Sequence, residues 1–124
     1  MESEEVRRLL PLSPLSLSIL LALADADRHG YGIMKEVERL SAGHVRAGAG
    51  SLYAALQRLA TDGLVAESGG AAGEDARRRY FTLTALGRRA ARAEMLRLAH
   101  TLEEGRAKRL LPGLRLTIPR EAAS

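Results

Sequence analysis

Apolar positions spaced three or four residues apart predict helices in four parts of the chain. The first is a largely apolar stretch in which Ser13 and Pro14 suit the cap and the first helical position. The next two carry one apolar stripe each, as helices with a single buried face do. The stripes are Ile33, Val37 and Leu40, then Leu52, Leu56 and Leu59. The helices are expected over about residues 13–25, 31–41, 51–62 and 84–104. The last of them ends near Glu104 or continues beyond Gly105.

Two short segments between the third and the last helix resemble β-strands. Residues 64–67 form the first candidate, and residues 79–84 alternate polar and apolar positions in the second. Residues 68–76, rich in Gly and Ala, would form the tip of a hairpin. Gly63 can adopt the left-handed backbone conformation that commonly follows the end of a helix. The three glycines within 42–50 indicate a turn.

This order of helices, turn and hairpin is typical of a winged helix-turn-helix. The expected fold class is therefore mainly α with a small β-hairpin, a winged helix-turn-helix followed by a C-terminal dimerisation helix. The expected divisions are a loosely held N-terminal arm (1–12), the DNA-binding domain (13–84), the dimerisation helix (85–111) and a tail (112–124).

Composition narrows the function classes. The chain has 124 residues, of which 46% are hydrophobic, enough for one core. It has no cysteine, which excludes a disulfide framework, a thiolate metal site and a cysteine nucleophile. The net charge of +4 favours an acidic partner such as nucleic acid. The alternative is that this small excess of positive charge is spread over the surface and indicates no particular partner.

Catalytic and metal-binding patterns are missing from the sequence. The three histidines, His29, His44 and His100, lie far apart, and no nucleophile elbow, phosphate-binding loop or dinucleotide fingerprint occurs. We therefore expect no enzyme activity, no metal and no cofactor; His29 is expected to bond backbone at the start of the second helix.

The apolar stretch near the N-terminus has an alternative interpretation as a signal peptide. Arg7 and Arg8 precede it, and Ala22-Leu23-Ala24 would suit a signal peptidase. Acidic residues before the stretch, and prolines and serines within it, favour a buried helix instead. The remaining apolar run is far shorter than the ~20 residues that span a bilayer, so a cytoplasmic protein with no membrane partner is expected.

The third helix is the candidate recognition helix. Opposite its leucine stripe lies a face of small and polar residues without an acidic side chain before Asp62. Small residues allow close approach to DNA, Gln57 can bond adenine, and Arg58 can bond guanine or phosphate. An ordinary amphipathic helix with a neutral outer face is the alternative. The candidate DNA-binding residues are Lys35 on the second helix and Gly50, Ser51, Tyr53, Ala54, Gln57 and Arg58.

The hairpin supplies a second candidate DNA contact. Arg77, Arg78 and Arg79 stand side by side where the loop enters the second strand. We interpret them as wing residues that lie on the phosphate backbone. The alternative is that Glu74 and Asp75 neutralise them.

The last helix has two apolar faces. Ala91, Met95, Leu98 and Leu102 follow each other at 4-3-4 spacing and form a candidate dimer interface. A different face carries Leu86, Ala90 and Ala93, which would pack on the winged domain. Burial of both faces within one chain is the alternative, but the other helices are few and short.

Three blocks of residues resemble the PadR family of transcriptional regulators. They are His29-Gly30-Tyr31, then Gly50-Ser51-Leu52-Tyr53 with Leu56, Arg58-Leu59 and Gly63-Leu64-Val65, and finally Arg78 to Thr84 with Gly87. The resemblance covers about residues 15–90. It implies a dimeric repressor with a winged domain and a C-terminal helix, and in some members a phenolic or flat aromatic effector.

This chain departs from the family pattern in three respects. Gly48-Ala49 stands where Ser-Pro is usual, Ala54 stands where a proline commonly follows the helix tyrosine, and there is no tryptophan for the stacking pocket of drug-binding members. We therefore predict a regulator, a repressor by resemblance, that binds a palindromic operator in double-stranded DNA as a homodimer, with a small hydrophobic effector as a further candidate partner. The alternatives are a winged-helix protein-interaction module and a ligand-binding dimer without DNA binding.

Overall fold

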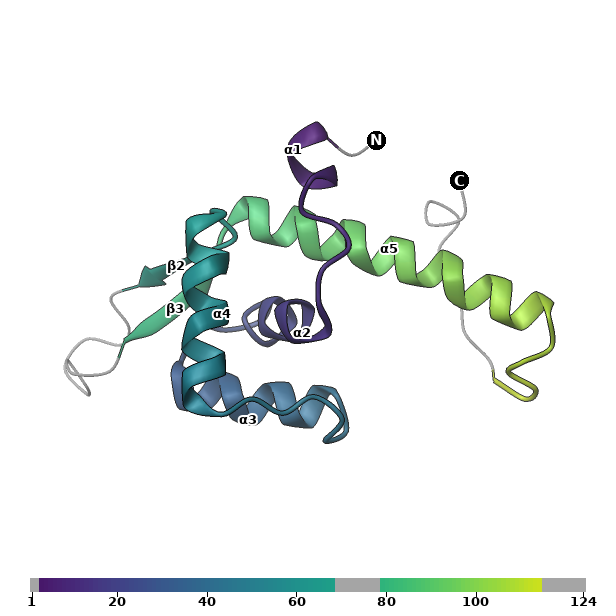
Figure 1. Cartoon of the computed structure of the whole chain (residues 1–124), viewed down its shortest axis with the longest axis horizontal. Helices are drawn as coiled ribbons and strands as arrows, with labels where there is room; N and C mark the ends of the chain where they lie inside the picture. Colours follow the sequence, from purple (N-terminus) through teal and green to yellow (C-terminus); the bar gives the residue numbers. More distant parts are fainter. Residues whose placement is uncertain (1–2, 69–78, 115–124) are drawn as a thin grey trace.

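The computed structural model describes residues 3–68 and 79–114. Helices α2, α3 and α4 and a small sheet gather at one end of α5, whose other end extends away from them (Figure 1). The fold is mainly helical, as predicted. The elements are α1 (Glu4–Arg7), α2 (Pro14–Ala22), β1 (Arg28–His29), α3 (Gly30–Leu40), α4 (Ala49–Thr61), β2 (Val65–Ser68), β3 (Tyr80–Leu83) and α5 (Ala85–Ala107).

Side-chain caps fix the starts of three helices where the sequence places them. The Ser13 hydroxyl accepts from the Ser16 amide at 3.1 Å, and Thr84 accepts from the Gly87 amide at 3.0 Å. His29 Nδ1 accepts from the Gly32 amide at 3.1 Å, which confirms its expected backbone bond. Each bond satisfies an amide that the helix itself leaves without an acceptor.

Two helix boundaries differ from the prediction. The first long helix ends at Ala22 rather than near residue 25, and α4 begins at Ala49 rather than near residue 51. The start of α4 is hard to predict because its cap residue, Gly48, makes no side-chain bond to the first turn.

The sheet has three antiparallel strands in the order β1-β3-β2. The predicted hairpin is confirmed, with Val65 opposite Leu83 and Ser68 opposite Tyr80. The third strand, β1, was not predicted. Its two residues are too few to show alternation, and they pair with Phe81 and Tyr80 of β3, which lie far away in the sequence.

The core lies where α2, α3 and α4 meet the sheet and the first half of α5. The predicted apolar stripes supply most of it: Ile33 and Val37 from α3, and Leu52, Leu56 and Leu59 from α4, are all buried. Leu40, the last residue of the predicted α3 stripe, is exposed. The remaining large members are Val6, Ile19, Leu20, Leu23, Leu64, Val65 and Phe81.

The segment expected to be a loosely held arm is packed on α5. Val6 of α1 is fully buried, and the Leu12 amide donates to Glu94 Oε2 at 3.0 Å. Glu94 is itself buried and also accepts from Arg97 at 2.6 Å. The expectation was wrong because the segment has its own buried apolar residue and a buried carboxylate to bind.

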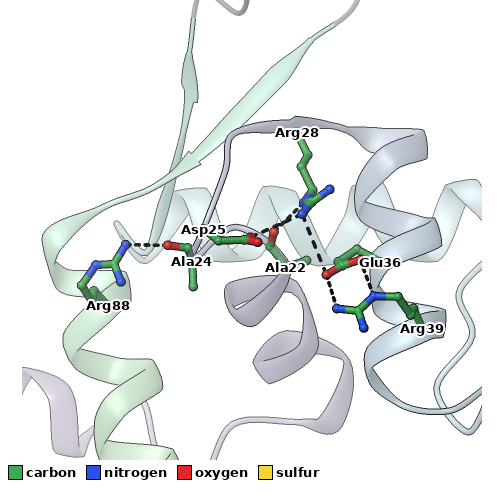
Figure 2. A network of polar contacts seen from close by, with 7 residues as sticks. All are labelled: Ala22, Ala24, Asp25, Arg28, Glu36, Arg39 and Arg88. Atoms are coloured by element: carbon green, nitrogen blue, oxygen red, sulfur yellow. Dashed lines mark hydrogen bonds and ion pairs between the residues drawn. The ribbon is translucent and has the colours of Figure 1, made fainter.

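Two arginines bind carbonyl groups at and beyond the C-terminal end of α2 (Figure 2). Arg28 Nε donates to the Ala22 carbonyl at 2.7 Å, and Arg88 of α5 donates to the Ala24 carbonyl at 3.0 Å. Arg28 also lies 3.8 Å from Glu36, whose carboxylate accepts from Arg39 at 2.9 and 2.7 Å. Hydrogen bonds from Arg39 hold the pKa of Glu36 below its usual value. The network ties β1, α3 and α5 to the end of α2.

Within residues 3–68 and 79–114, no helix combines the length and apolar character needed to cross a membrane.

Helices α3 and α4 end in the same hydrogen-bonded turn but with different residues in the left-handed position. After α4, Gly63 has φ +80°, and the Leu64 amide donates to the Leu59 carbonyl at 2.8 Å. After α3, Ala42 has φ 52°, and the Gly43 amide donates to the Glu38 carbonyl at 2.8 Å. A Cβ in this conformation approaches the following carbonyl, which costs ~1–2 kcal/mol.

Ala42→Gly should therefore raise the free energy of unfolding by about 0.5–1 kcal/mol, since part of the relief is offset by the added freedom of the unfolded chain. Gly63→Ala should lower it by about 1–2 kcal/mol. Ala54→Gly, in the exposed middle of α4, is the control and should cost about 1 kcal/mol. Urea unfolding measures all three; a loss in Ala42→Gly equal to that in the control would contradict the assignment.

Candidate nucleic-acid interface

Helix α4 divides into a buried face and an exposed face, as the leucine stripe predicted. Leu52, Ala55, Leu56 and Leu59 are at most 4% exposed. The opposite side remains exposed along the whole helix. Its residues are Gly50, Ser51, Ala54, Gln57, Arg58 and Thr61.

The start of α4 is open to an external anion. Gly48 gives no side-chain cap, and the first turn contains no acidic residue. A Cβ placed at Gly50 would meet no atom within 4 Å. The amides of the first turn and the positive end of the helix dipole therefore face an unobstructed surface that suits phosphate.

Tyr53, a predicted DNA contact, also packs against neighbouring elements of its own chain. Its ring packs 6.5 Å from that of Phe81, and its hydroxyl occupies the space where a side chain at position 30 would begin. Tyr53 is 40% exposed, but it is turned toward α3 and the sheet. Its first role is to join α4 to Gly30, which explains the glycine between His29 and Tyr31.

Lys35 is exposed on α3, and its ammonium lies 5.5 Å from the centre of the Tyr31 ring. Tyr31 is 61% exposed and stacks on His29, which meets Tyr80 edge to face. Tyr31 was not among the predicted DNA contacts, although it lies in the first turn of α3 beside Lys35.

Arg79 forms an ion pair that the sequence analysis overlooked. Its Nε and Nη2 donate to the two carboxylate oxygens of Glu67 on β2 at 2.8 and 3.0 Å. Hydrogen bonding by Arg79 holds the pKa of Glu67 below its usual value. The predicted contacts at Arg77 and Arg78, and the alternative partners Glu74 and Asp75, lie outside the described residues.

Hollows flank α4 on two sides. One lies between the helix and the hairpin and includes Gln57, Glu67 and Arg79 in its lining. The other lies toward the N-terminal segment and includes Arg58, Ser13 and Ser16. Gln57 and Arg58 are therefore directed to different sides of the same exposed face.

The outer part of the predicted dimer interface is exposed in the single chain. Met95 is 44% exposed and Leu98 is 38% exposed, while Leu102 is half-buried. Ala91 differs, because it is 8% exposed and belongs to the core of its own chain. The second predicted face is confirmed: Ala90 and Ala93 are buried there, with Leu86 packed against the core.

Among the described residues, no group of histidines and carboxylates is arranged to hold a metal ion.

Comparison with known proteins identifies the class of the chain. The profile of the transcriptional regulator PadR-like family matches residues 19–93, which is more than half of the sequence. The chain belongs to this family, as its sequence predicted. The match begins within α2 and ends within α5, so it includes all of α3, α4 and the sheet.

The chain is also similar to individual proteins in fold or in part of its sequence. A PadR family transcription regulator from Clostridium difficile has a TM-score of 0.63 at 20% identity, covering 77% of this chain and 97% of that one. RosR from H. salinarum has a TM-score of 0.57 at 27% identity, and the match covers 77% of this chain and 79% of RosR. An uncharacterized 37.1 kDa protein in a Streptomyces fradiae transposon is 47% identical over 70 residues, which are 56% of this chain and only 19% of that relative.

The contact between Tyr53 and Gly30 gives a test of how α4 is held. Gly30→Ala should lower the free energy of unfolding by about 1–3 kcal/mol, because the new methyl group overlaps the tyrosine. In a Tyr53→Ala background the same change should cost much less, since the space is then open. Thermal unfolding of the four proteins measures the coupling; equal costs in both backgrounds would contradict the contact.

Proposed function

We propose that the protein is a sequence-specific repressor that binds a palindromic operator as a homodimer, with α4 as the recognition helix. The observation that carries the proposal is the exposed face of α4, which is small and polar from Gly50 to Thr61 and has no acidic side chain. Such a face fits the major groove, which is ~12 Å wide, while the buried face keeps the helix fixed to the domain. Because its target is DNA, we place the protein in the cytoplasm.

Different residues of the interface serve different parts of recognition. Gln57, in the middle of the exposed face, is assigned to base edges, and Ala54 and Gly50 allow close approach. Arg58 is assigned to base or phosphate, and Ser51 and Lys35 are assigned to phosphate. The wing arginines Arg77, Arg78 and Arg79 are assigned to the backbone of the DNA, and Tyr53 contributes chiefly by positioning α4.

A second copy of the chain is the proposed partner of the outer half of α5. Met95, Leu98 and Leu102 form the seam, and Ala91 lies at its start, already covered by its own subunit. Burying a Leu or Met contributes ~1.5–3 kcal/mol, so a symmetric pair of seams can hold a dimer. Two recognition helices would then match the two halves of a palindrome.

The winged-helix protein-interaction module and the ligand-binding dimer make a different prediction. Neither requires affinity for duplex DNA, whereas the proposed regulator should bind it with a steep dependence on salt. A small hydrophobic effector, which the family resemblance implies, stays a prediction without an assigned site.

Gln57→Ala should weaken binding to the preferred operator by ~1–3 kcal/mol and change binding to random duplex little, because a base contact is lost. The control is Lys35→Ala, which should weaken binding to both duplexes alike through a lost phosphate contact. Fluorescence anisotropy with both duplexes gives the comparison. An equal loss on both for Gln57→Ala would place this side chain on the backbone instead.

Leu98→Asp should dissociate the dimer, because it places an unpaired charge in the apolar seam. Operator affinity should fall sharply with it, since one recognition helix reads half a site. His100→Asp, exposed on the opposite side of α5, is the matched control and should remain dimeric. Sedimentation measures the mass, with circular dichroism as the check on folding. The seam assignment fails if folded Leu98→Asp stays dimeric.

A further inference from the structure

Among the described residues that line the hollow between α4 and the hairpin, Glu67 is the one that carries a carboxylate. Glu67 lies on β2 opposite Phe81, and Arg79 reaches it diagonally from the start of β3. Tyr53 and Gln57 of α4 line the other wall. An acidic residue here is unexpected, because the exposed face of α4 itself carries none.

The ion pair holds Arg79 in a defined place. Two guanidinium nitrogens donate to two carboxylate oxygens, and the guanidinium carbon lies 5.6 Å from the centre of the Phe81 ring. Bidentate pairs of this kind fix geometry as well as charge. The pair has no net charge, so a phosphate gains little attraction from Arg79 while Glu67 holds it.

The pair is also open to exchange. Both side chains are 55% exposed, and an ion pair in water is weak enough for another anion to replace one partner. With α4 in the major groove, the sugar–phosphate strand that borders the groove runs along the hairpin side of the helix. A phosphate of that strand is the anion that would meet Arg79.

We propose that Glu67 competes with a DNA phosphate for Arg79 and thereby limits the affinity of the protein for DNA of any sequence. The inference rests on the proposed function and adds a residue that sets its strength. Phosphate contacts supply affinity without sequence information. When the Glu67 carboxylate keeps Arg79 from a phosphate, base contacts such as that of Gln57 contribute a larger share of the binding free energy.

Glu67→Gln removes the competing charge and keeps the size of the side chain. It should bind random and operator duplexes several-fold more tightly than the wild type. The log–log slope of affinity against salt should steepen by a fraction of ~0.9, the value for one full phosphate contact, because Glu67 holds Arg79 from the phosphate for part of the time in the wild type. Glu103→Gln is the matched control, because Glu103 forms a similar exposed ion pair with Arg106 on α5, and it should change neither quantity.

The double variant Glu67→Gln/Arg79→Gln identifies the route of the effect. If Glu67 acts by holding Arg79, the second substitution should abolish the gain in affinity and the steeper slope. A gain that survives in the double variant would overturn the proposal, because Glu67 would then act through its own charge on the DNA. An unchanged or weaker Glu67→Gln, folded by circular dichroism, would also overturn it. A wild-type protein without salt-dependent affinity for duplex DNA would overturn the proposed function as well.

Discussion

The burial of one face of α4 is the constraint on which the rest of the structure depends. Leu52, Ala55, Leu56 and Leu59 contact a core to which α2, α3, the sheet and α5 all contribute. Because that face cannot turn outward without exposing four apolar side chains, the opposite face is fixed toward solvent. Its small and polar residues are therefore presented in one orientation, which is what a helix that reads a groove requires.

Close contacts at two glycines set the neighbours of α4. The Tyr53 hydroxyl occupies the place of a side chain at Gly30, which brings the start of α3 against α4. A side chain at Gly87 would overlap the carbonyl of Leu64, so α5 begins directly on the strand that follows α4. Thr84 strengthens the same junction by donating to the Gly63 carbonyl at 2.6 Å while it caps α5. The hairpin and the long helix are thus both positioned from the C-terminal end of α4.

Local patterns predicted the helices, their caps and the two faces of α4, because these depend on spacing within a few residues. The packed N-terminal segment and β1 were missed, since Val6 and Arg28 acquire their partners from α5 and β3. The Glu67–Arg79 pair was missed for a related reason. Twelve positions separate the two residues, and only the register of the hairpin brings them together. The contact of Tyr53 with Gly30 was not predicted, because the position of Tyr53 on its helix does not reveal this neighbour.

We propose that α4 and the hairpin recognise DNA and that the outer half of α5 holds the dimer together. An amide chemical-shift titration of the dimeric protein with the duplex upstream of its own gene tests this division directly. We expect the largest shifts on the amides of Gly50, Ser51, Ala54 and Gln57 and on β2 and β3. Shifts concentrated at Met95 to Leu102, with the α4 amides unmoved, would contradict it.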